Sequence, residues 1–345
     1  MRKLCYLLLL GFIVLFYQPV FAESVFPEDK WVQVESAESV GWSTEKFKRL
    51  SDFAEANGTL GLMIIQDGKV VYSYGKIEER TYMASVRKSL ISGLIGIYVE
   101  EGKINMESTL ESLDIDDSAP SLTPQEKQAR VIDLLKARSG IYHEPAAETE
   151  KMNAARPPRG SHAPGTYWYY NNWDFDTLGV IFENQTKLSI GKAFFERIAK
   201  PIGMQQFSSS DVDYNKSSKS IHPAYRFKMS TQDLARYGLL YLNNGTWRGK
   251  QIIPQQWIVD STTSYSTISP GFGYGYMWWL PSNFIYGQPI NGTAWWAQGL
   301  SGQHLIIIPS MNLVIAHLAP YDVTRVHTGL MSKNLLHLIF DARVK

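Results

Sequence analysis

The chain has almost no cysteine: Cys5 is the only one among its 345 residues, and it lies close to the N-terminus. Beyond that point there is no thiol, which excludes disulfide bridges, cysteine nucleophiles and cysteine-ligated metals. The net charge is also small, at +1, from 34 basic and 33 acidic residues. Such a balance gives no electrostatic reason to expect nucleic acid or an anionic membrane as a partner.

Two common signatures of hydrolases are missing from the sequence. There is no Gly-x-Ser-x-Gly motif of the kind that marks a Ser-His-Asp hydrolase. The pair His143-Glu144 is not followed by the second histidine that a zinc-binding helix needs. We therefore expect neither a metal nor another cofactor.

The N-terminus has the pattern of a secretory signal peptide. Arg2 and Lys3 precede an apolar run from Leu7 to Phe16, and Ala22 ends a small-x-small cleavage site. We predict that residues 1–22 are removed and that residues 23–345 form the mature protein, exported to the periplasm or secreted. An uncleaved membrane anchor is the alternative, and the cleavage site argues against it.

Patterns of apolar residues predict the order of the elements. Asp67-Gly68 between two β-rich runs is a strong hairpin signal. The expected strands are Leu60 to Gln66, Lys69 to Tyr74, Tyr274 to Leu280, Thr293 to Gln298, Gln303 to Ile308 and Leu313 to Leu318. The expected helices are Ser43 to Ala56, the stretch from Ser85 to about Gly102, Gln125 to Ala137, Thr177 to Asn184, Ile190 to Lys200, Ser230 to Asn243 with Thr231 as its cap, and Val326 to Phe340.

Strands at both ends of the chain with helices between them indicate an α/β fold of the α+β type. We expect an antiparallel sheet flanked by helices, and an inserted helical lobe at about 104–240. The oligomeric state cannot be inferred from these patterns.

The stretch that stands out chemically is Ser85-Val86-Arg87-Lys88, at the start of the predicted apolar helix. Residues three apart share one face of a helix, so the hydroxyl and the amine can touch. Burial disfavours the charged form of lysine, and a neutral amine can take the proton of a serine hydroxyl. The same spacing recurs at Ser43/Lys46, Ser73/Lys76 and Ser189/Lys192, to which we assign no chemistry.

Two further stretches can complete such a site. Residues 164–173 form a predicted loop rich in tyrosine and asparagine, which can supply a proton-sharing phenol and an amide. Residues 297–303, with two glycines between strand-like runs, can bring a second backbone N–H to an oxyanion. Taken singly, either stretch is as readily explained by loop packing or an ordinary tight turn.

Together, these stretches resemble the serine β-lactamase and penicillin-binding protein family, whose first element is Ser-x-x-Lys. The nearer likeness is to its class C and esterase branch, and within it to 6-aminohexanoate-dimer hydrolase-like proteins. The second element of that branch, Pro-Gly-x-x-aromatic-x-Tyr-x-Asn, matches Pro164, Trp168, Tyr170 and Asn172. The overlapping pair Tyr169/Asn171 fits the distance from Pro164 less well.

The resemblance implies roles for the remaining residues. Ser85 is the nucleophile of an acyl-enzyme, Lys88 with Tyr170 moves its proton, and Asn172 orients Lys88 and the substrate. Ser301, Gly302 and Gln303, at the third element, bind the substrate or its oxyanion, and the N–H of Gln303 holds the oxyanion together with that of Ser85.

One departure from the family matters for the substrate. The third element usually opens with lysine or histidine, and here it reads Leu300-Ser301-Gly302. The missing cation favours hydrolysis of a neutral ester, amide or short peptide-like molecule. A D-alanyl-D-alanine carboxypeptidase or β-lactamase is the alternative, and a non-catalytic binding or sensor protein is an alternative of another class.

Overall fold

The computed structural model describes residues 25–322 and 329–344. The predicted signal peptide, residues 1–22, and the predicted start of the last helix at Val326 lie outside the described residues. In the part of the chain that is described, no helix is both long enough and apolar enough to cross a membrane.

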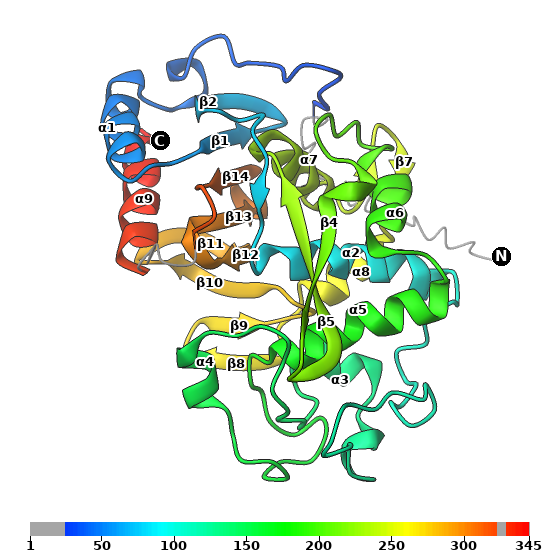
Figure 1. Cartoon of the computed structure of the whole chain (residues 1–345). Coiled ribbons are helices and arrows are strands. Elements are labelled where there is room, and N and C mark those ends of the chain that lie inside the picture. Colours follow the sequence, from blue (N-terminus) through cyan, green and yellow to red (C-terminus); the bar gives the residue numbers. More distant parts are fainter. Residues whose placement is uncertain (1–24, 323–328, 345) are drawn as a thin grey trace, which may run out of the picture.

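An antiparallel sheet forms the centre of the described chain (Figure 1). Its strands are β1 (Gly61–Gln66), β2 (Lys69–Gly75), β8 (Ser266–Ser269), β9 (Phe272–Tyr274), β10 (Trp279–Ile285), β11 (Gln288–Thr293), β12 (Trp295–Gly299), β13 (Gln303–Ile308) and β14 (Leu313–Leu318). Their spatial order is β2-β1-β14-β13-β12-β10-β9-β8, with β11 paired to β10. Strands far apart in the sequence therefore lie side by side inside the sheet, where β1 pairs with β14 from Gly61–Leu318 to Gln66–Leu313.

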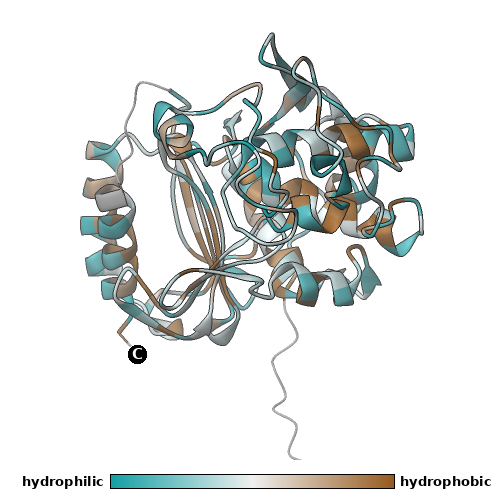
Figure 2. Cartoon of the chain, turned by 90° about the horizontal axis from the view of Figure 1, so that it is seen from below, coloured by the Kyte–Doolittle hydropathy of each residue, from teal (hydrophilic) through white to brown (hydrophobic). Residues whose placement is uncertain are grey.

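Two apolar layers cover the sheet. Helices α1 (Thr44–Ala56) and α9 (Gly329–Ala342) lie together on one face, over a core that includes Leu50, Ile64 and Leu336. The other face packs against helices α2 (Val86–Glu100), α7 (Thr231–Leu242) and α8 (Gln255–Ser261). Figure 2 shows the sheet edge-on between the terminal helices and the rest of the chain.

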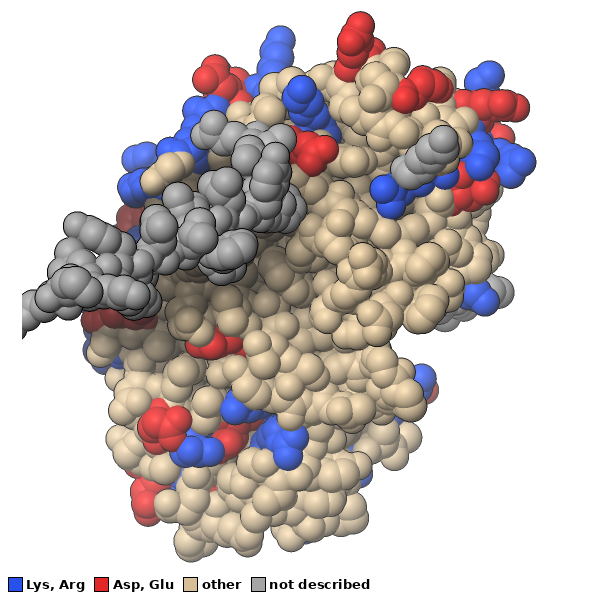
Figure 3. Space-filling view, turned by 180° about the vertical axis from the view of Figure 1, so that it is seen from behind, with Lys and Arg blue, Asp and Glu red and all other residues tan. Residues whose placement is uncertain are grey.

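The lobe is built on the α2 side of the sheet. Its helices are α3 (Val131–Leu135), α4 (Glu150–Ala155), α5 (Asn172–Thr186) and α6 (Ile190–Phe194). A smaller sheet joins β3 (Thr81–Tyr82), β5 (Ser220–Met229) and β4 (Val212–Ser217), and a tight hairpin joins β6 (Thr246–Trp247) to β7 (Lys250–Gln251). On the face seen in Figure 3, basic and acidic side chains are interspersed, in keeping with the small net charge.

Helix α2 is buried on all sides, as its sequence predicts. Each residue from Val86 to Tyr98 is buried, which a surface helix with one apolar stripe does not show. Close packing requires glycine at Gly96, because a Cβ there would lie 2.2 Å from Cγ of Trp257 on α8. A helix held this tightly is a rigid support for the residues at its first turn.

The fold class and several elements are confirmed. The central sheet is antiparallel and flanked by helices, β13 and β14 have the predicted bounds, and the Asp67-Gly68 turn closes the β1–β2 hairpin. Both turn residues have positive φ, 51° and 78°, as this type of hairpin requires.

Other predicted elements are wrong, and local contacts explain why. The hairpin of β4 and β5 was not expected in the helical lobe, because Pro223 weakens the strand pattern; it is tolerated next to an irregularity of the ladder between Asn215 and Ser217. Helix α7 is capped by Ser230, whose Oγ accepts the N–H of Asp233, and not by Thr231. The single helix predicted from Gln125 is interrupted before α3, and the strand predicted from Tyr274 is interrupted between β9 and β10.

Candidate active site

Ser85 lies at the junction between β3 and α2. The Met83 N–H donates to the Phe227 carbonyl at 2.8 Å, and the Val86 N–H donates to the Met83 carbonyl at 3.0 Å. Ala84 has a φ of 45°, a strained value for a residue with a Cβ, and such strain concentrates at functional sites. These contacts hold Ser85 at the start of α2 with its side chain partly exposed and not used as a helix cap.

The Lys88 amine lies at the meeting point of three side chains. Its Nζ is 2.9 Å from Ser85 Oγ, 2.7 Å from Tyr170 OH and 2.7 Å from Asn172 Oδ1. Lys88 is only 2% exposed, and the ring of Phe175 closes one side of the amine at 4.8 Å. The structure thus brings together four residues that the sequence analysis selected from two distant stretches.

Burial decides the charge of these groups. It lowers the pKa of Lys88 well below its ordinary value; the neighbouring Arg87 cation lowers this pKa further, and Asp176 raises it. Burial also raises the pKa of Tyr170 to about 12, against an interaction with the Ser85 hydroxyl that lowers it. Burial thus favours the uncharged form of the amine and the protonated form of the phenol, so the amine is the group better suited to accept the Ser85 proton.

The other serines with the same spacing to a lysine behave differently. Ser43 Oγ accepts the backbone N–H of Lys46, and Ser189 Oγ accepts that of Lys192, each at 3.3 Å. Both are helix N-caps, which is the usual role of serine in this position. Ser85 is distinguished by its contact with the lysine side chain.

Helix α5 positions Asn172, and it begins five residues earlier than predicted. Asn171 caps the helix by accepting the N–H of Trp173 at 3.2 Å, so Asn172 is helical and not part of a loop. The Asn172 amide nitrogen donates to the Ala147 carbonyl at 2.7 Å and has Met152 Sδ as its other neighbour, at 3.9 Å. Asn172 is therefore placed to hold Lys88, while its contact with substrate stays a prediction.

The overlapping pair, Tyr169 and Asn171, makes its hydrogen bonds away from Lys88. Tyr169 OH donates to the Met152 carbonyl at 2.8 Å, and Asn171 Nδ2 donates to the Ile141 carbonyl at 2.7 Å. Both residues therefore connect the stretch before α5 to other parts of the lobe.

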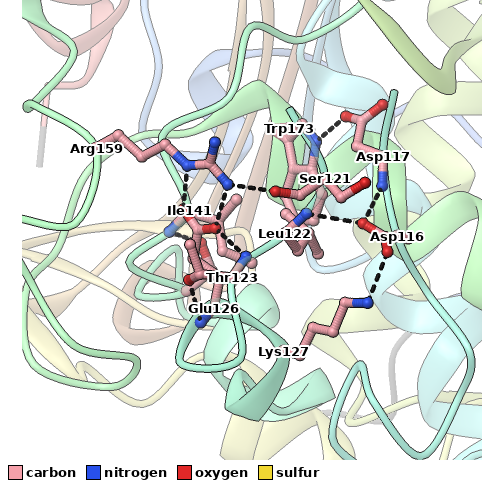
Figure 4. A network of polar contacts seen from close by, with 11 residues as sticks. Asp116, Asp117, Ser121, Leu122, Thr123, Glu126, Lys127, Ile141, Arg159 and Trp173 are labelled. Atoms are coloured by element: carbon pink, nitrogen blue, oxygen red, sulfur yellow. Dashed lines mark hydrogen bonds and ion pairs between the residues drawn. The ribbon is translucent and has the colours of Figure 1, made fainter. Parts of the chain in front are cut away.

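A polar network in the lobe secures the start of α5 (Figure 4). The Trp173 indole N–H donates to Asp117 Oδ2 at 2.6 Å, and Asp117 also accepts from the Ser220 hydroxyl and the Ile221 N–H. Asp116, Lys127, Glu126 and Arg159 extend the network through two ion pairs. Since Trp173 directly follows Asn172, these bonds fix the residue that holds the amine.

The third predicted stretch forms a tight turn between β12 and β13. Ser301 has a φ of 63° and its Oγ donates to the Asp322 carbonyl, while the Gly302 carbonyl accepts from His317 Nδ1 at 2.6 Å. The fully buried Gln303 side chain donates to the Ala319 carbonyl at 2.9 Å and accepts its N–H. The side chains of Ser301 and Gln303 therefore stabilise the turn between β12 and β13 and are not free to bind substrate.

The residue of this stretch that approaches Ser85 is Gly299, at the end of β12. A Cβ on Gly299 would lie 2.7 Å from the Met83 carbonyl oxygen and 3.1 Å from Ala84 Cβ. Only a glycine permits this approach, because the nearest atom belongs to the backbone. Sequence analysis noted the two glycines but assigned the oxyanion contact to the N–H of Gln303, because the left-handed turn at Ser301 could not be foreseen.

Aromatic rings surround Tyr170. Its ring stacks on the partly exposed Trp279 at 5.1 Å, and Trp279 stacks on Phe272 at 5.6 Å. Trp168 packs edge-on against Trp279 at 6.0 Å, whereas Trp173 is fully buried. Within the described residues there is no cluster of three or more His, Cys, Asp or Glu side chains that could hold a metal.

Comparison with known proteins identifies relatives of this chain. A family model for β-lactamase matches residues 48–327. The 6-aminohexanoate-dimer hydrolase of Paenarthrobacter ureafaciens is 21% identical over 322 residues, which cover 82% of this chain and 78% of that protein. Protein flp of Staphylococcus aureus (strain COL) is 26% identical over 190 residues, 49% of this chain but only 37% of that protein, so the match spans little more than a third of that relative's length.

A solved structure shows the same fold. The octameric penicillin-binding protein homologue from Pyrococcus abyssi superposes with a TM-score of 0.64 at 20% identity, covering 87% of this chain and 78% of that one. Because the family match covers well over half of the residues, and the solved neighbour has the same architecture, the chain belongs to the β-lactamase family of hydrolases.

Proposed function

We propose that the protein hydrolyses ester or amide bonds of small neutral or short peptide-like molecules through an acyl-enzyme on Ser85. The observation that carries this proposal is the buried Lys88 amine, in contact with both Ser85 Oγ and Tyr170 OH. A nucleophile within hydrogen-bond distance of a base that other groups hold in place is the arrangement that covalent catalysis requires.

The proposed steps follow from the charges of these groups. Ser85 Oγ attacks the carbonyl carbon as its proton passes to the neutral Lys88 amine. That proton then moves, with Tyr170 as the relay, to the leaving oxygen or nitrogen as its bond to the carbonyl breaks. Water attacks the acyl-enzyme, gives a proton back through Lys88 and restores the Ser85 hydroxyl.

The oxyanion of each tetrahedral intermediate needs two N–H donors. One is the N–H of Ser85 at the positive end of α2. We place the second at the Gly299–Leu300 end of β12, in place of Gln303, because Gly299 leaves no room for a Cβ beside the Met83 carbonyl oxygen and the Ala84 side chain, directly before Ser85.

Replacing Gly299 by alanine tests this placement. The added Cβ would meet backbone atoms, so β12 must move away from Ser85, and we expect kcat/KM to fall about 10²-fold, the typical effect of losing one oxyanion donor. Gly160→Asn is a suitable control, since nothing lies within 4 Å of a Cβ there and asparagine tolerates a positive φ. Unchanged activity in a folded Gly299→Ala protein would place the second donor elsewhere.

The absence of a cation at the third element supports neutral substrates. Leu300, which is 50% exposed, and Ser301 occupy the place of the family's lysine or histidine. A charge-assisted hydrogen bond to a substrate carboxylate contributes about 1.5–3 kcal/mol, so its loss weakens binding of carboxylate-bearing β-lactams and peptides. The relative named for the 6-aminohexanoate dimer is consistent with an amide substrate.

A substrate panel tests the proposed substrate class. We expect turnover of p-nitrophenyl butyrate. The kcat/KM for nitrocefin should be lower than that for the ester by about 10- to 100-fold, the factor that corresponds to the lost hydrogen bond to the carboxylate. Faster turnover of nitrocefin than of the ester would favour a β-lactamase or D-alanyl-D-alanine carboxypeptidase. A stoichiometric acyl adduct without turnover would favour a non-catalytic binding or sensor protein.

A further inference from the structure

A buried ion pair lies directly beside the catalytic amine. Arg87, the residue before Lys88, is 7% exposed, and its Nη2 donates to Oδ1 of the fully buried Asp176 at 2.7 Å. The Arg87 guanidinium also lies over the ring of Tyr225, 4.2 Å from its centre. None of these three residues has a part in the proposed reaction steps.

The ion pair and the Lys88 contact form two parallel connections between the same helices. Arg87 and Lys88 are consecutive on α2, while Asn172 and Asp176 are one turn apart on α5 and share a face of that helix. Lys88 binds Asn172 and Arg87 binds Asp176. Any shift of α2 against α5 that breaks one connection strains the other.

The stability of the fold does not by itself explain why Arg87 and Asp176 form a buried ion pair. Taking two charges out of water is costly, and apolar residues of similar size are often as stable or more so. The cost is higher here because Arg87 Nη1 and Asp176 Oδ2 are buried and have no hydrogen-bond partner among the described residues.

We propose that Arg87 and Asp176 are positioning residues that align the Lys88 amine with Ser85 and fix the charges beside it, and so set the pH range of acylation. This inference rests on the proposed function, because it assigns Lys88 the role of base. Arg87 places a fixed positive charge beside the amine, which opposes its protonation. Asp176 holds Arg87 in place and partly offsets its charge.

The surroundings of Lys88 allow the two effects to be separated. The groups that face it are Ser85 and Arg87 from α2, Asn172 and Asp176 from α5, and Tyr170 from the segment before α5; Tyr225 of β5 reaches Arg87. Of these groups, Arg87 and Asp176 are the charged ones, and they move the pKa of Lys88 in opposite directions: Arg87 lowers it and Asp176 raises it.

The test is the pH profile of acylation, measured as kcat/KM for p-nitrophenyl butyrate and as the rate of fluorophosphonate labelling. The acidic limb, the low-pH side of the profile where the rate falls, reports protonation of the base. We expect Asp176→Asn to shift this limb to lower pH and Arg87→Met to shift it to higher pH, each by about one unit, the lower end of the usual effect of a nearby charge. A purely structural pair would reduce the rate without moving the limb in opposite directions.

A double variant covers the case in which a single one does not fold. Arg87→Met/Asp176→Leu removes both charges and leaves no unpaired buried ion. Its acidic limb is expected at higher pH than that of the wild type, because the effect of Arg87 on Lys88 exceeds that of Asp176. Glu101→Gln is the matched control: it breaks the ion pair with Arg197 at the other end of α2 and should leave the limb in place.

The possible outcomes separate this inference from the proposed function. Superimposed profiles, or shifts of both single variants in the same direction, would overturn the role of the ion pair while leaving Ser85 chemistry intact. A wild-type protein that is not acylated at any pH would overturn the proposed function, and this inference with it.

Discussion

Replacing Ser85 by alanine should abolish turnover of p-nitrophenyl butyrate and labelling by a fluorophosphonate. Ser85 is partly exposed at the start of α2, and its hydroxyl contacts the Lys88 amine. Without it no acyl-enzyme can form, and we expect kcat/KM to fall by on the order of 10⁴-fold or more. The measurement is initial rates together with labelling of the purified proteins.

The chain provides matched controls for this variant. Ser43 and Ser189 have the same spacing to a lysine but cap α1 and α6. Ser43→Ala and Ser189→Ala should each cost about 1 kcal/mol of stability, as a lost cap does, and keep full activity. Comparable activity in Ser85→Ala and the two controls would rule out Ser85 as the nucleophile.

Replacing Lys88 by methionine should separate activity from stability. In the proposed reaction the Lys88 amine is the base for Ser85, and losing a general base typically lowers the rate by about 10²–10⁴-fold. Methionine fills a similar volume without a group that must be kept uncharged, so we expect the variant to have a higher Tm than the wild type at neutral pH. The rate of labelling and thermal unfolding measure the two effects.

The stability difference should depend on pH in a defined direction. Burial lowers the pKa of Lys88 in the folded protein, so the unfolded chain binds one more proton than the folded chain between the folded value and the ordinary value of lysine. The free energy of unfolding of the wild type therefore rises with pH across that interval. The advantage of Lys88→Met should shrink as the pH is raised through the same interval and vanish above it.

A suitable control is Lys46→Met, which changes a half-exposed lysine that binds Asp341 on the protein surface. It should keep its activity. A Lys88→Met protein that loses less than about tenfold in labelling rate would show that another group takes the Ser85 proton, since even a weak general base is worth more.

Much of the fold could be predicted because local patterns decide it. The apolar run of α2, the Asp67-Gly68 turn and the strands β13 and β14 follow from residues close together in sequence. The β4–β5 hairpin could not be predicted in the same way, since β5 contains Pro223 and depends on pairing with β3, far away in the chain.

The candidate site shows the same division. The nucleophile and its lysine lie one helical turn apart, so their contact is local. The correct tyrosine and asparagine needed the family resemblance, because Tyr169 and Asn171 offer the same spacing. Gly299 and the Arg87–Asp176 pair were missed, since their roles depend on how β12 and α5 pack against α2.

The most direct test of this account is to identify the acylated residue. Wild-type protein is mixed with p-nitrophenyl butyrate, quenched in acid during turnover, digested and analysed by mass spectrometry. A single butyryl group on the Ser85 hydroxyl, absent after the reaction is complete, is the predicted result. A butyryl group on another residue, or turnover with no adduct at any time, would contradict it.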